Sequence, residues 1–239
     1  MKTWSLENFE SYRKSWKEAI LEYQKKVDLY TISEAAAPSY AHSFDLISWF
    51  FWRRIFYVIS YLYEMKNPGK VLDFGCGLGI ILPYVQNISE SVWAVDPFIK
   101  PARHFQSKMN FSGVKLYDSL EDCVSDNERF DTIITLDVLE HIENLSAKLI
   151  ELRDIMEPNG RIIVSGPTEN WIYKIGRLAA GFHKIYKKLG NTPGISNPFH
   201  HHTIYDVEKT LKECGFKVNP IKTLYPLLTL FRIIVAEKI

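Results

Sequence analysis

The feature that most constrains this chain is the decapeptide Lys-Val-Leu-Asp-Phe-Gly-Cys-Gly-Leu-Gly at residues 70–79. A short apolar segment is interrupted by one acid, Asp73, and leads into glycines at every second position, Gly75, Gly77 and Gly79. Glycine lacks the Cβ atom that would hold a ligand away from the main chain. The pattern therefore predicts a buried strand followed by a loop on which a small ligand lies directly.

The spacing of the glycines separates several kinds of nucleotide site. A helix is expected from Gly79 to Gln86, with free N–H groups that would face a bound carboxylate. No Gly-Lys-Ser or Gly-Lys-Thr follows, which excludes a P-loop, and the Gly-x-Gly-x-x-Gly spacing of a dinucleotide loop is absent. Asp73 would repel a pyrophosphate but can hold an ammonium group. A glycine-rich turn without a ligand is the alternative for this motif taken alone.

A second strand ends in an acid at the expected interval. Residues 91–97 are Ser-Val-Trp-Ala-Val-Asp-Pro, which places Asp96 and Pro97 after a short apolar run. Asp96 lies 23 residues after Asp73, close to the interval of about 20 residues known for ribose-binding acids. Its carboxylate can accept both hydroxyls of a ribose. The alternative is that Asp96 caps a helix that begins near Ile99.

Two more segments repeat the pattern of a short apolar strand followed by an acidic residue. Residues 113–119 form another brief strand pattern that closes with Asp118 and Ser119. Residues 130–142 are an almost continuous apolar run, typical of a strand buried on both faces, with Asp137 near its end in the sequence Asp-Val-Leu-Glu-His.

These motifs, in this order, resemble the class I S-adenosylmethionine-dependent methyltransferases, in particular those that modify small molecules and lipids. The resemblance is close over residues 68–166. It implies an α/β, Rossmann-like fold, with a mostly parallel seven-stranded sheet, helices on both faces and an N-terminal helical cap. It also implies S-adenosylmethionine as cofactor, with Asp118 beside the adenine. The cofactor-binding residues expected from the motifs are Asp73, Gly75, Cys76, Gly77, Gly79, Asp96, Pro97, Asp118, Ser119 and Asp137.

The expected organisation is a helical cap at residues 1–66 and a cofactor-binding domain at residues 67–239, with an insertion at 167–202. Apolar side chains recur at steps of three and four from Phe9 to Tyr30, which predicts a long amphipathic helix. A second, aromatic-rich helix is predicted from Phe44 to Glu64. In the family such helices often roof the active site, and the alternative is ordinary core packing against the sheet.

The second helix is not predicted to cross a membrane. Arg53 and Arg54 interrupt its apolar run, and each would cost about 2.5 to 3.5 kcal/mol in a bilayer. Residues 171–189 instead predict a basic amphipathic helix, which could contact an anionic membrane or an anionic substrate headgroup. The alternative is a lid helix with a solvated lysine face. After it we expect a helix from Thr203 to Cys214 and a terminal pair of strands.

Charge and cysteine usage narrow the functional classes. Lys and Arg number 29 against 28 Asp and Glu, a net charge of +1, so no overall bias toward nucleic acid exists. Residues 197–199, Asn-Pro-Phe, lack the second proline of the motif found in amino-methylating enzymes, which also makes nucleic-acid methylation a weaker prediction than methylation of a small molecule.

Three cysteines without Cys-x-x-Cys spacing argue against a disulfide framework and a zinc ribbon, and residues 1–10 lack the apolar segment of a secretory signal. We therefore expect a cytoplasmic protein, with peripheral membrane contact as an option.

The chemistry implied by the resemblance is methyl transfer to a small apolar or lipid-linked acceptor by in-line displacement. Positioning is expected to dominate, and a base is needed only when the acceptor still carries a proton. The candidates are His141, His201 and His202, of which His141 often supports the loop in the family. A metal is not expected, because the side chains of consecutive histidines point apart. A non-catalytic cofactor-binding partner, a nucleic-acid methyltransferase and an NAD-dependent oxidoreductase remain the alternatives.

Overall fold

The structure is a computed structural model that describes residues 6–28, 31, 37–42, 45–124, 128–168, 200–220 and 230–239. The chain forms two compact units, Met1–Cys123 and Val124–Ile239. The boundary predicted between residues 66 and 67 lies inside the first unit and stays a prediction.

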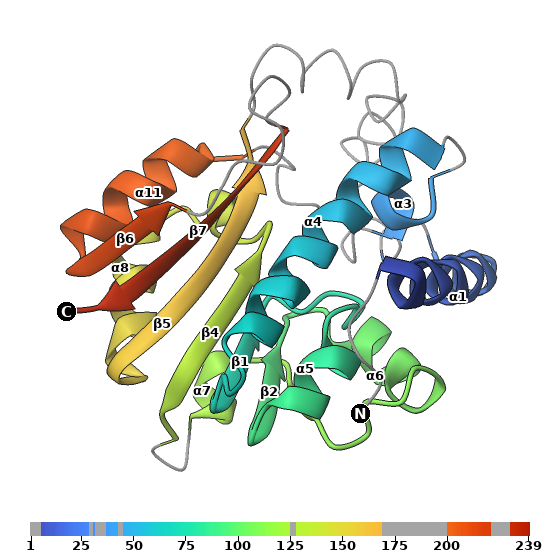
Figure 1. Cartoon of the computed structure of the whole chain (residues 1–239), viewed down its shortest axis with the longest axis horizontal. Helices are drawn as coiled ribbons and strands as arrows, with labels where there is room; N and C mark the ends of the chain where they lie inside the picture. Colours follow the sequence, from blue (N-terminus) through green and yellow to red (C-terminus); the bar gives the residue numbers. More distant parts are fainter. Residues whose placement is uncertain are drawn as a thin grey trace. The chain divides into compact units, whose positions relative to one another are not determined.

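The first unit contains three parallel strands with helices between them. Its strands are β1 (Lys70–Phe74), β2 (Ser91–Val95) and β3 (Lys115–Tyr117). Its helices, coloured blue to green in Figure 1, are α1 (Leu6–Gln24), α3 (Ala37–Tyr40), α4 (Asp45–Glu64), α5 (Leu82–Ile88), α6 (Lys100–Lys108) and α7 (Leu120–Cys123). Phe74 pairs with Val95, and Val95 pairs with Tyr117. The carboxyl ends of the three strands therefore lie at one edge, where ligands of open α/β sheets bind.

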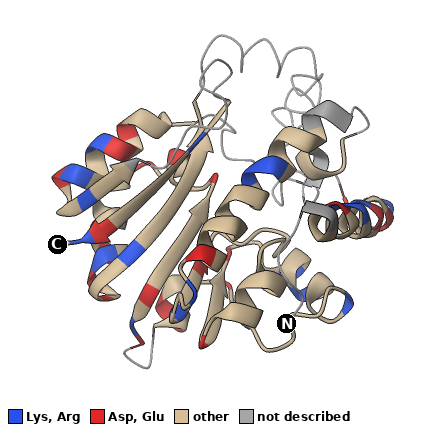
Figure 2. Ribbon diagram, viewed as in Figure 1, with Lys and Arg blue, Asp and Glu red and all other residues tan. Residues whose placement is uncertain are grey.

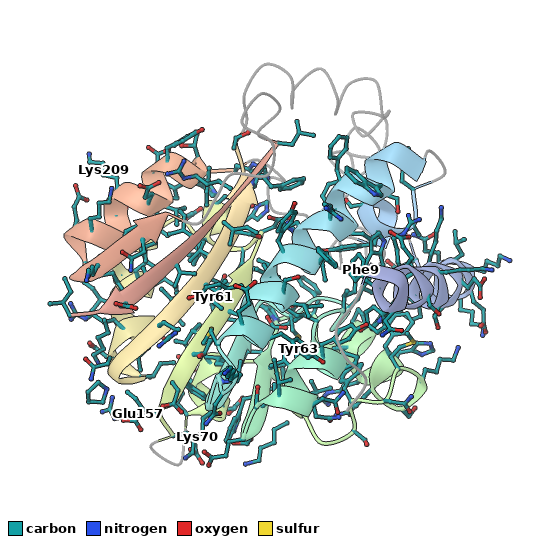
Figure 3. The ribbon with its side chains drawn as sticks, in the orientation of Figure 1. Phe9, Tyr61, Tyr63, Lys70, Glu157 and Lys209 are labelled. Carbon is teal, nitrogen blue, oxygen red and sulfur yellow. The ribbon has the colours of Figure 1, made fainter. Side chains whose placement is uncertain are left out.

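Aromatic side chains hold α1 in place within this unit. Phe9, which is labelled in Figure 3, pairs with Trp52 and Phe56 on α4, with ring centroids 6.1 and 5.1 Å apart. Trp16 packs on Phe105 of α6 at 5.1 Å and is fully buried. Edge-on aromatic pairs of this kind add about 0.5 to 1.5 kcal/mol to the free energy of burial. Figure 2 shows acidic and basic residues at intervals along α1.

The first helix is shorter than its apolar pattern predicts. The pattern is right for Tyr23, which is buried, but α1 ends at Gln24 and Val27 follows the helix. Tyr30 lies outside the described residues. Asp28 accepts hydrogen bonds from both the N–H and the hydroxyl of Thr31, each at 2.9 Å. This side-chain turn offers the backbone an alternative to helix.

The predicted second helix is confirmed as α4, whose bounds are Asp45–Glu64. Its two arginines have different surroundings. Arg54 is buried and donates to the hydroxyl of Tyr40 at 2.5 Å, whereas Arg53 lies over the rings of Phe56 and Tyr57 at 4.9 and 5.1 Å. Among the residues that the structure describes, no helix combines the length and apolar character that a membrane span needs.

The second unit contains the remaining strands. They are β4 (Phe130–Leu136), β5 (Met156–Pro167), β6 (Phe216–Pro220) and β7 (Phe231–Lys238). The helices described with them are the 3₁₀ turn η1 (Leu139–His141), α8 (Leu145–Asp154) and α11 (Ile204–Glu213). The predicted terminal hairpin is confirmed, because β6 and β7 pair antiparallel. Helix α8 ends two residues before the expected Met156, because Met156 pairs with Phe130 in the sheet.

Helix α11 begins at a complete capping box. Thr203 accepts a hydrogen bond from the Asp206 N–H at 3.3 Å, and the Asp206 carboxylate accepts one from the Thr203 N–H at 2.8 Å. Gly215 follows the helix with a φ of +80°, the left-handed conformation that terminates helices. The predicted basic helix at 171–189 and the predicted strand residues 221–225 lie outside the described residues.

The fold class is confirmed. The strand order is β3-β2-β1-β4-β5-β7-β6 in a seven-stranded sheet. The pairs β1 with β2, β2 with β3 and β4 with β5 are parallel, and β7 pairs antiparallel with both β5 and β6. The chain therefore has the mostly parallel α/β sheet that the sequence predicts.

Candidate functional site

The glycine loop follows β1 at the carboxyl edge of the first unit. Gly75, Gly77 and Gly79 have φ angles of +81°, +55° and +78°, which side chains other than glycine rarely adopt. The N–H groups of Gly75 and Cys76 donate to the carbonyl of Val95 at 2.8 and 3.2 Å, which fastens the loop to the end of β2. The glycines are thus required by the backbone conformation itself. The packing of Gly79 adds a second reason, since a Cβ there would come within 3.0 Å of the Phe111 ring.

Asp96 joins the loop to the segment after β2. One carboxylate oxygen accepts the N–H of Gly77 at 2.8 Å, and the other accepts the N–H of Phe98 at 2.8 Å. Helix α6 has Ile99 as its N-cap, with no side-chain cap, so Asp96 is not the helix cap considered as an alternative. Each carboxylate oxygen can accept more than one hydrogen bond. Asp96 can therefore support the loop and still accept ribose hydroxyls.

The electrostatics of the loop favour a positively charged ligand. Asp73 is 3% exposed, and burial, together with the charge of Asp96, raises the pKa of its carboxyl to about 8. Burial also raises the pKa of Asp96, opposed by the hydrogen bonds from Gly77 and Phe98. The pKa of the Cys76 thiol is raised by burial and then by both acids. A cation placed here would stabilise the ionised carboxylates, as opposite charges do at short range.

The helix after the loop begins later than expected. Helix α5 starts at Leu82 rather than Gly79. The N–H of Leu82 donates to Gly79 O and that of Tyr84 to Ile81 O, both at 3.1 Å, and Pro83 has no N–H. The first turn therefore does not direct free N–H groups at a bound carboxylate. A contact between the cofactor's carboxylate and this part of the chain stays a prediction.

The predicted cofactor-binding residues Asp118 and Ser119 directly follow β3. The N–H of Asp96 donates to Tyr117 O at 3.1 Å, which keeps the ends of β2 and β3 together. Asp118 follows and is exposed. The hydroxyl of Ser119 donates to Asp122 at 2.7 Å and accepts its N–H at 3.1 Å, so Ser119 caps α7. Pro97 is exposed on the neighbouring turn. Asp118 is free of a capping role, and its contact with adenine stays a prediction.

The remaining predicted residues belong to the second unit. Asp137 follows β4 with a φ of +57°, and its N–H donates to Ser165 O at 2.9 Å. His141 is exposed at the end of η1. The backbone N–H groups of His201 and His202 donate to Glu140 O at 2.7 and 3.2 Å. The segment that contains His141 and the segment that contains His201 and His202 are therefore joined by hydrogen bonds within this unit.

The structure groups residues that the sequence analysis did not combine. Potential metal-ligand atoms of Glu140, His141 and His200 all lie within 4.8 Å of one another. The rings of His141 and His200 meet edge-on, with centroids 4.7 Å apart. The sequence pattern that could have indicated this group is an acid and a histidine after a buried strand, with a further histidine before a helix cap.

Tyr12 is a residue that the sequence analysis did not identify. It donates its hydroxyl to Ile80 O at 2.7 Å, and the sequence shows only that it belongs to the apolar face of an amphipathic helix.

The geometry can be set beside known proteins. Residues 51–219, more than half of the chain, match a family described as "Methyltransferase domain". Ubiquinone biosynthesis O-methyltransferase of Bradyrhizobium diazoefficiens is 27% identical over 113 residues, which cover 43% of this chain and 41% of that protein. The Rickettsia felis protein of the same name is 30% identical over 118 residues, covering 47% and 48%. The chain thus spans less than half the length of these curated relatives.

Solved structures show the same fold. Magnesium protoporphyrin IX methyltransferase from Synechocystis PCC 6803, with bound SAH, has a TM-score of 0.54 at 22% identity, covering 78% of this chain and 83% of that one. An O-methyltransferase family protein from Burkholderia thailandensis has a TM-score of 0.59 at 15% identity, covering 85% and 59%. At these identities the likeness is one of fold.

Proposed function

The chain belongs to the methyltransferase domain family, and from that premise we propose that it transfers the methyl group of S-adenosylmethionine to an oxygen atom of a small-molecule acceptor. When bound, the cofactor supplies both the activated methyl carbon and a neutral thioether leaving group. The bond from carbon to sulfur breaks as the bond from carbon to the acceptor oxygen forms. The hydroxyl proton passes to a base or to water.

The observation that carries this proposal is the pair of acids at the glycine loop, the buried Asp73 and the half-buried Asp96. S-adenosylmethionine has an ammonium group and a sulfonium, and the raised pKa values of Asp73 and Asp96 describe a site that gains from a nearby cation. Asp73 holds the ammonium group, and Asp96 accepts the ribose hydroxyls while its other hydrogen bonds hold the loop. A pyrophosphate would increase the negative charge at the same position, which disfavours a dinucleotide.

The choice of oxygen and of acceptor class is supported by the relatives. The curated proteins quoted above are named O-methyltransferases of ubiquinone biosynthesis. The acceptor we propose is an apolar, hydroxylated molecule, either small or linked to a lipid. The chain's main task is to align the acceptor oxygen with the methyl carbon, since orientation of two reactants can supply about 7 to 11 kcal/mol of the barrier.

Direct titration with S-adenosylmethionine tests the proposal. Hydrogen bonds to charged groups contribute about 1.5 to 3 kcal/mol each, so Asp96→Ala should weaken binding at least tenfold. The exposed Glu90→Gln variant serves as the charge-matched control. Gly77→Val should be more severe because of its φ of +55°. If the Asp96→Ala variant binds S-adenosylmethionine as tightly as the parent chain, Asp96 is not a cofactor-binding residue.

Activity is measured separately, with cofactor carrying a radiolabelled methyl group. The acceptor panel contains hydroxylated aromatic compounds, lipid extracts and RNA. Transfer to a hydroxylated compound supports the proposal. Cofactor binding without transfer to any acceptor class would point to a non-catalytic binding protein, and transfer to RNA alone would contradict the acceptor class.

A further inference from the structure

We propose that Glu140, His141 and His200 form a binding site for a divalent transition-metal ion in the second unit. One ligand atom from each residue, a carboxylate oxygen and two imidazole nitrogens, lies within 4.8 Å of the others. The sequence alone predicts no metal, because His200, His201 and His202 are consecutive and their side chains cannot all reach one ion. The fold instead combines the first of these histidines with two residues from a distant part of the chain.

The backbone keeps the two ligand-bearing segments together. Glu140 and His141 belong to η1, directly after β4, and His200 precedes α11. The carbonyl of Glu140 accepts the N–H groups of His201 and His202 at 2.7 and 3.2 Å. His200 is thereby tied, through its two successors, to the main chain of the other ligands. Ligands positioned by main-chain contacts lose little conformational freedom when an ion binds.

The distances suit an ion after a small adjustment. Zinc binds imidazole nitrogen and carboxylate oxygen at about 2.0 to 2.2 Å, so ligand atoms in a tetrahedral site lie about 3.4 Å apart. All the separations here are within 4.8 Å. His141 is exposed, so its ring can rotate toward the other two ligands without disturbing the core. Glu140, at 3% exposure, stays in place.

The donor set indicates the class of metal. Imidazole ligands suit zinc, copper, iron and nickel, whereas magnesium and calcium prefer sites made only of oxygen. Glu140 supplies one negative charge from a buried position. We therefore expect a first-row ion such as zinc or cobalt rather than magnesium.

Three protein ligands leave at least one coordination position for another oxygen. A zinc-bound water has a pKa near 7 rather than about 15.7, and a bound hydroxyl group is acidified in the same way. A hydroxyl group bound to the ion would therefore lose its proton to solvent more readily. Use of this effect on a methyl acceptor rests on the proposed function, whereas ion binding itself does not.

The test is titration of the metal-depleted full-length chain with Co²⁺, followed by visible absorption, and with Zn²⁺, followed by calorimetry. We expect one ion per chain and the ligand-field bands of a site containing nitrogen and oxygen. His200→Ala and Glu140→Gln should each lower the affinity on the order of 100-fold. His201→Ala is the matched control, because its side chain is exposed and its backbone hydrogen bond is retained.

Folding and cofactor binding are checked in the same variants by circular dichroism and S-adenosylmethionine titration. If Glu140→Gln does not fold, the exposed His141→Ala variant provides the same comparison. Absence of stoichiometric binding to the parent chain, or equal loss in His201→Ala, would overturn the inference. Cofactor binding and methyl transfer that persist without any metal binding would overturn the metal site while leaving the proposed function intact.

Discussion

Asp73 shows how a single buried carboxyl couples ligand binding to pH. Burial and Asp96 raise its pKa to about 8, so in the empty site the carboxyl is mostly protonated at neutral pH. A cofactor ammonium group is held by the ionised form. Binding therefore releases a proton, and the affinity for cofactor should increase with pH until the group is ionised before binding.

We predict that affinity for S-adenosylmethionine rises by up to about tenfold per pH unit between about pH 6 and pH 7.5. Asp73→Asn should bind about as weakly as the parent at about pH 6 and should lack the increase, because an amide does not titrate. Calorimetric titration across this range measures both proteins, with Glu90→Gln as the control. A parent affinity that is constant with pH would contradict the raised pKa.

The same residue affects stability with the opposite dependence. Its pKa in the folded protein lies above the ordinary value of 3.8. The stability that the protonated Asp73 contributes is therefore fully present below about pH 3.8 and is lost as the pH rises to about 8. Without cofactor, Asp73→Asn should therefore raise the melting temperature relative to the parent more at high pH than at low pH.

At the scale of elements, α1 supports the segment that follows the glycine loop. The hydroxyl of Tyr12 donates to the carbonyl of Ile80 at 2.7 Å, and its ring meets Tyr84 with centroids 4.5 Å apart. Burial raises the pKa of Tyr12 well above its usual value, so the hydroxyl remains a donor across the working range. This hydrogen bond links the first helix to the connection between β1 and α5.

We predict that Tyr12→Phe lowers the free energy of unfolding by about 1 to 3 kcal/mol, because the buried carbonyl of Ile80 loses its donor. Cofactor affinity should fall as well, since Ile80 directly follows the loop. Urea unfolding and cofactor titration measure the two effects. Tyr205→Phe, at an exposed tyrosine of the second unit, controls for loss of a hydroxyl, and equal stability of the two variants would show that α1 does not support the loop through this bond.

At the scale of the whole molecule, the charge balance decides what kind of surface the chain can bind. The net charge is +1, so attraction to an anionic membrane has to be local. Within segment 171–189, Lys174, Arg177, Lys184 and Lys188 form the predicted basic stripe, and Lys187 adds a further positive charge. Each basic residue near an anionic surface adds about 1 kcal/mol to binding, which is sufficient for weak, reversible association.

We predict that the chain sediments with anionic liposomes at low salt and is released by added salt, because this attraction is screened. Neutral liposomes should retain less. A variant with Lys184→Gln and Lys188→Gln should lose part of the binding, whereas Lys209→Gln with Lys212→Gln on α11 should keep it. Equal behaviour of the two double variants would show that segment 171–189 is not the contact, and a soluble acceptor would then be favoured.

The local repeats of strand, loop and helix could be predicted from the sequence, because their signals lie within a few residues. The buried β1, the turn at Gly77 and the acid at Asp96 follow from apolar runs, glycine spacing and a fixed interval along the chain. The start of α5 was misplaced because Pro83 can occupy the first turn of a helix, which the apolar pattern does not register.

Tertiary structure alone decided which distant groups meet. The hydrogen bond from Tyr12 to Ile80 and the grouping of Glu140 and His141 with His200 join segments separated by 68 and about 60 residues. The pKa of Asp73 likewise depends on burial and on Asp96 in the neighbouring strand. The sequence by itself determined the glycine loop and, through motifs that resemble a known family, the class of fold, because these motifs lie within short stretches of the chain. Packing decided the electrostatics and the candidate metal site, because charge and coordination depend on distances in space.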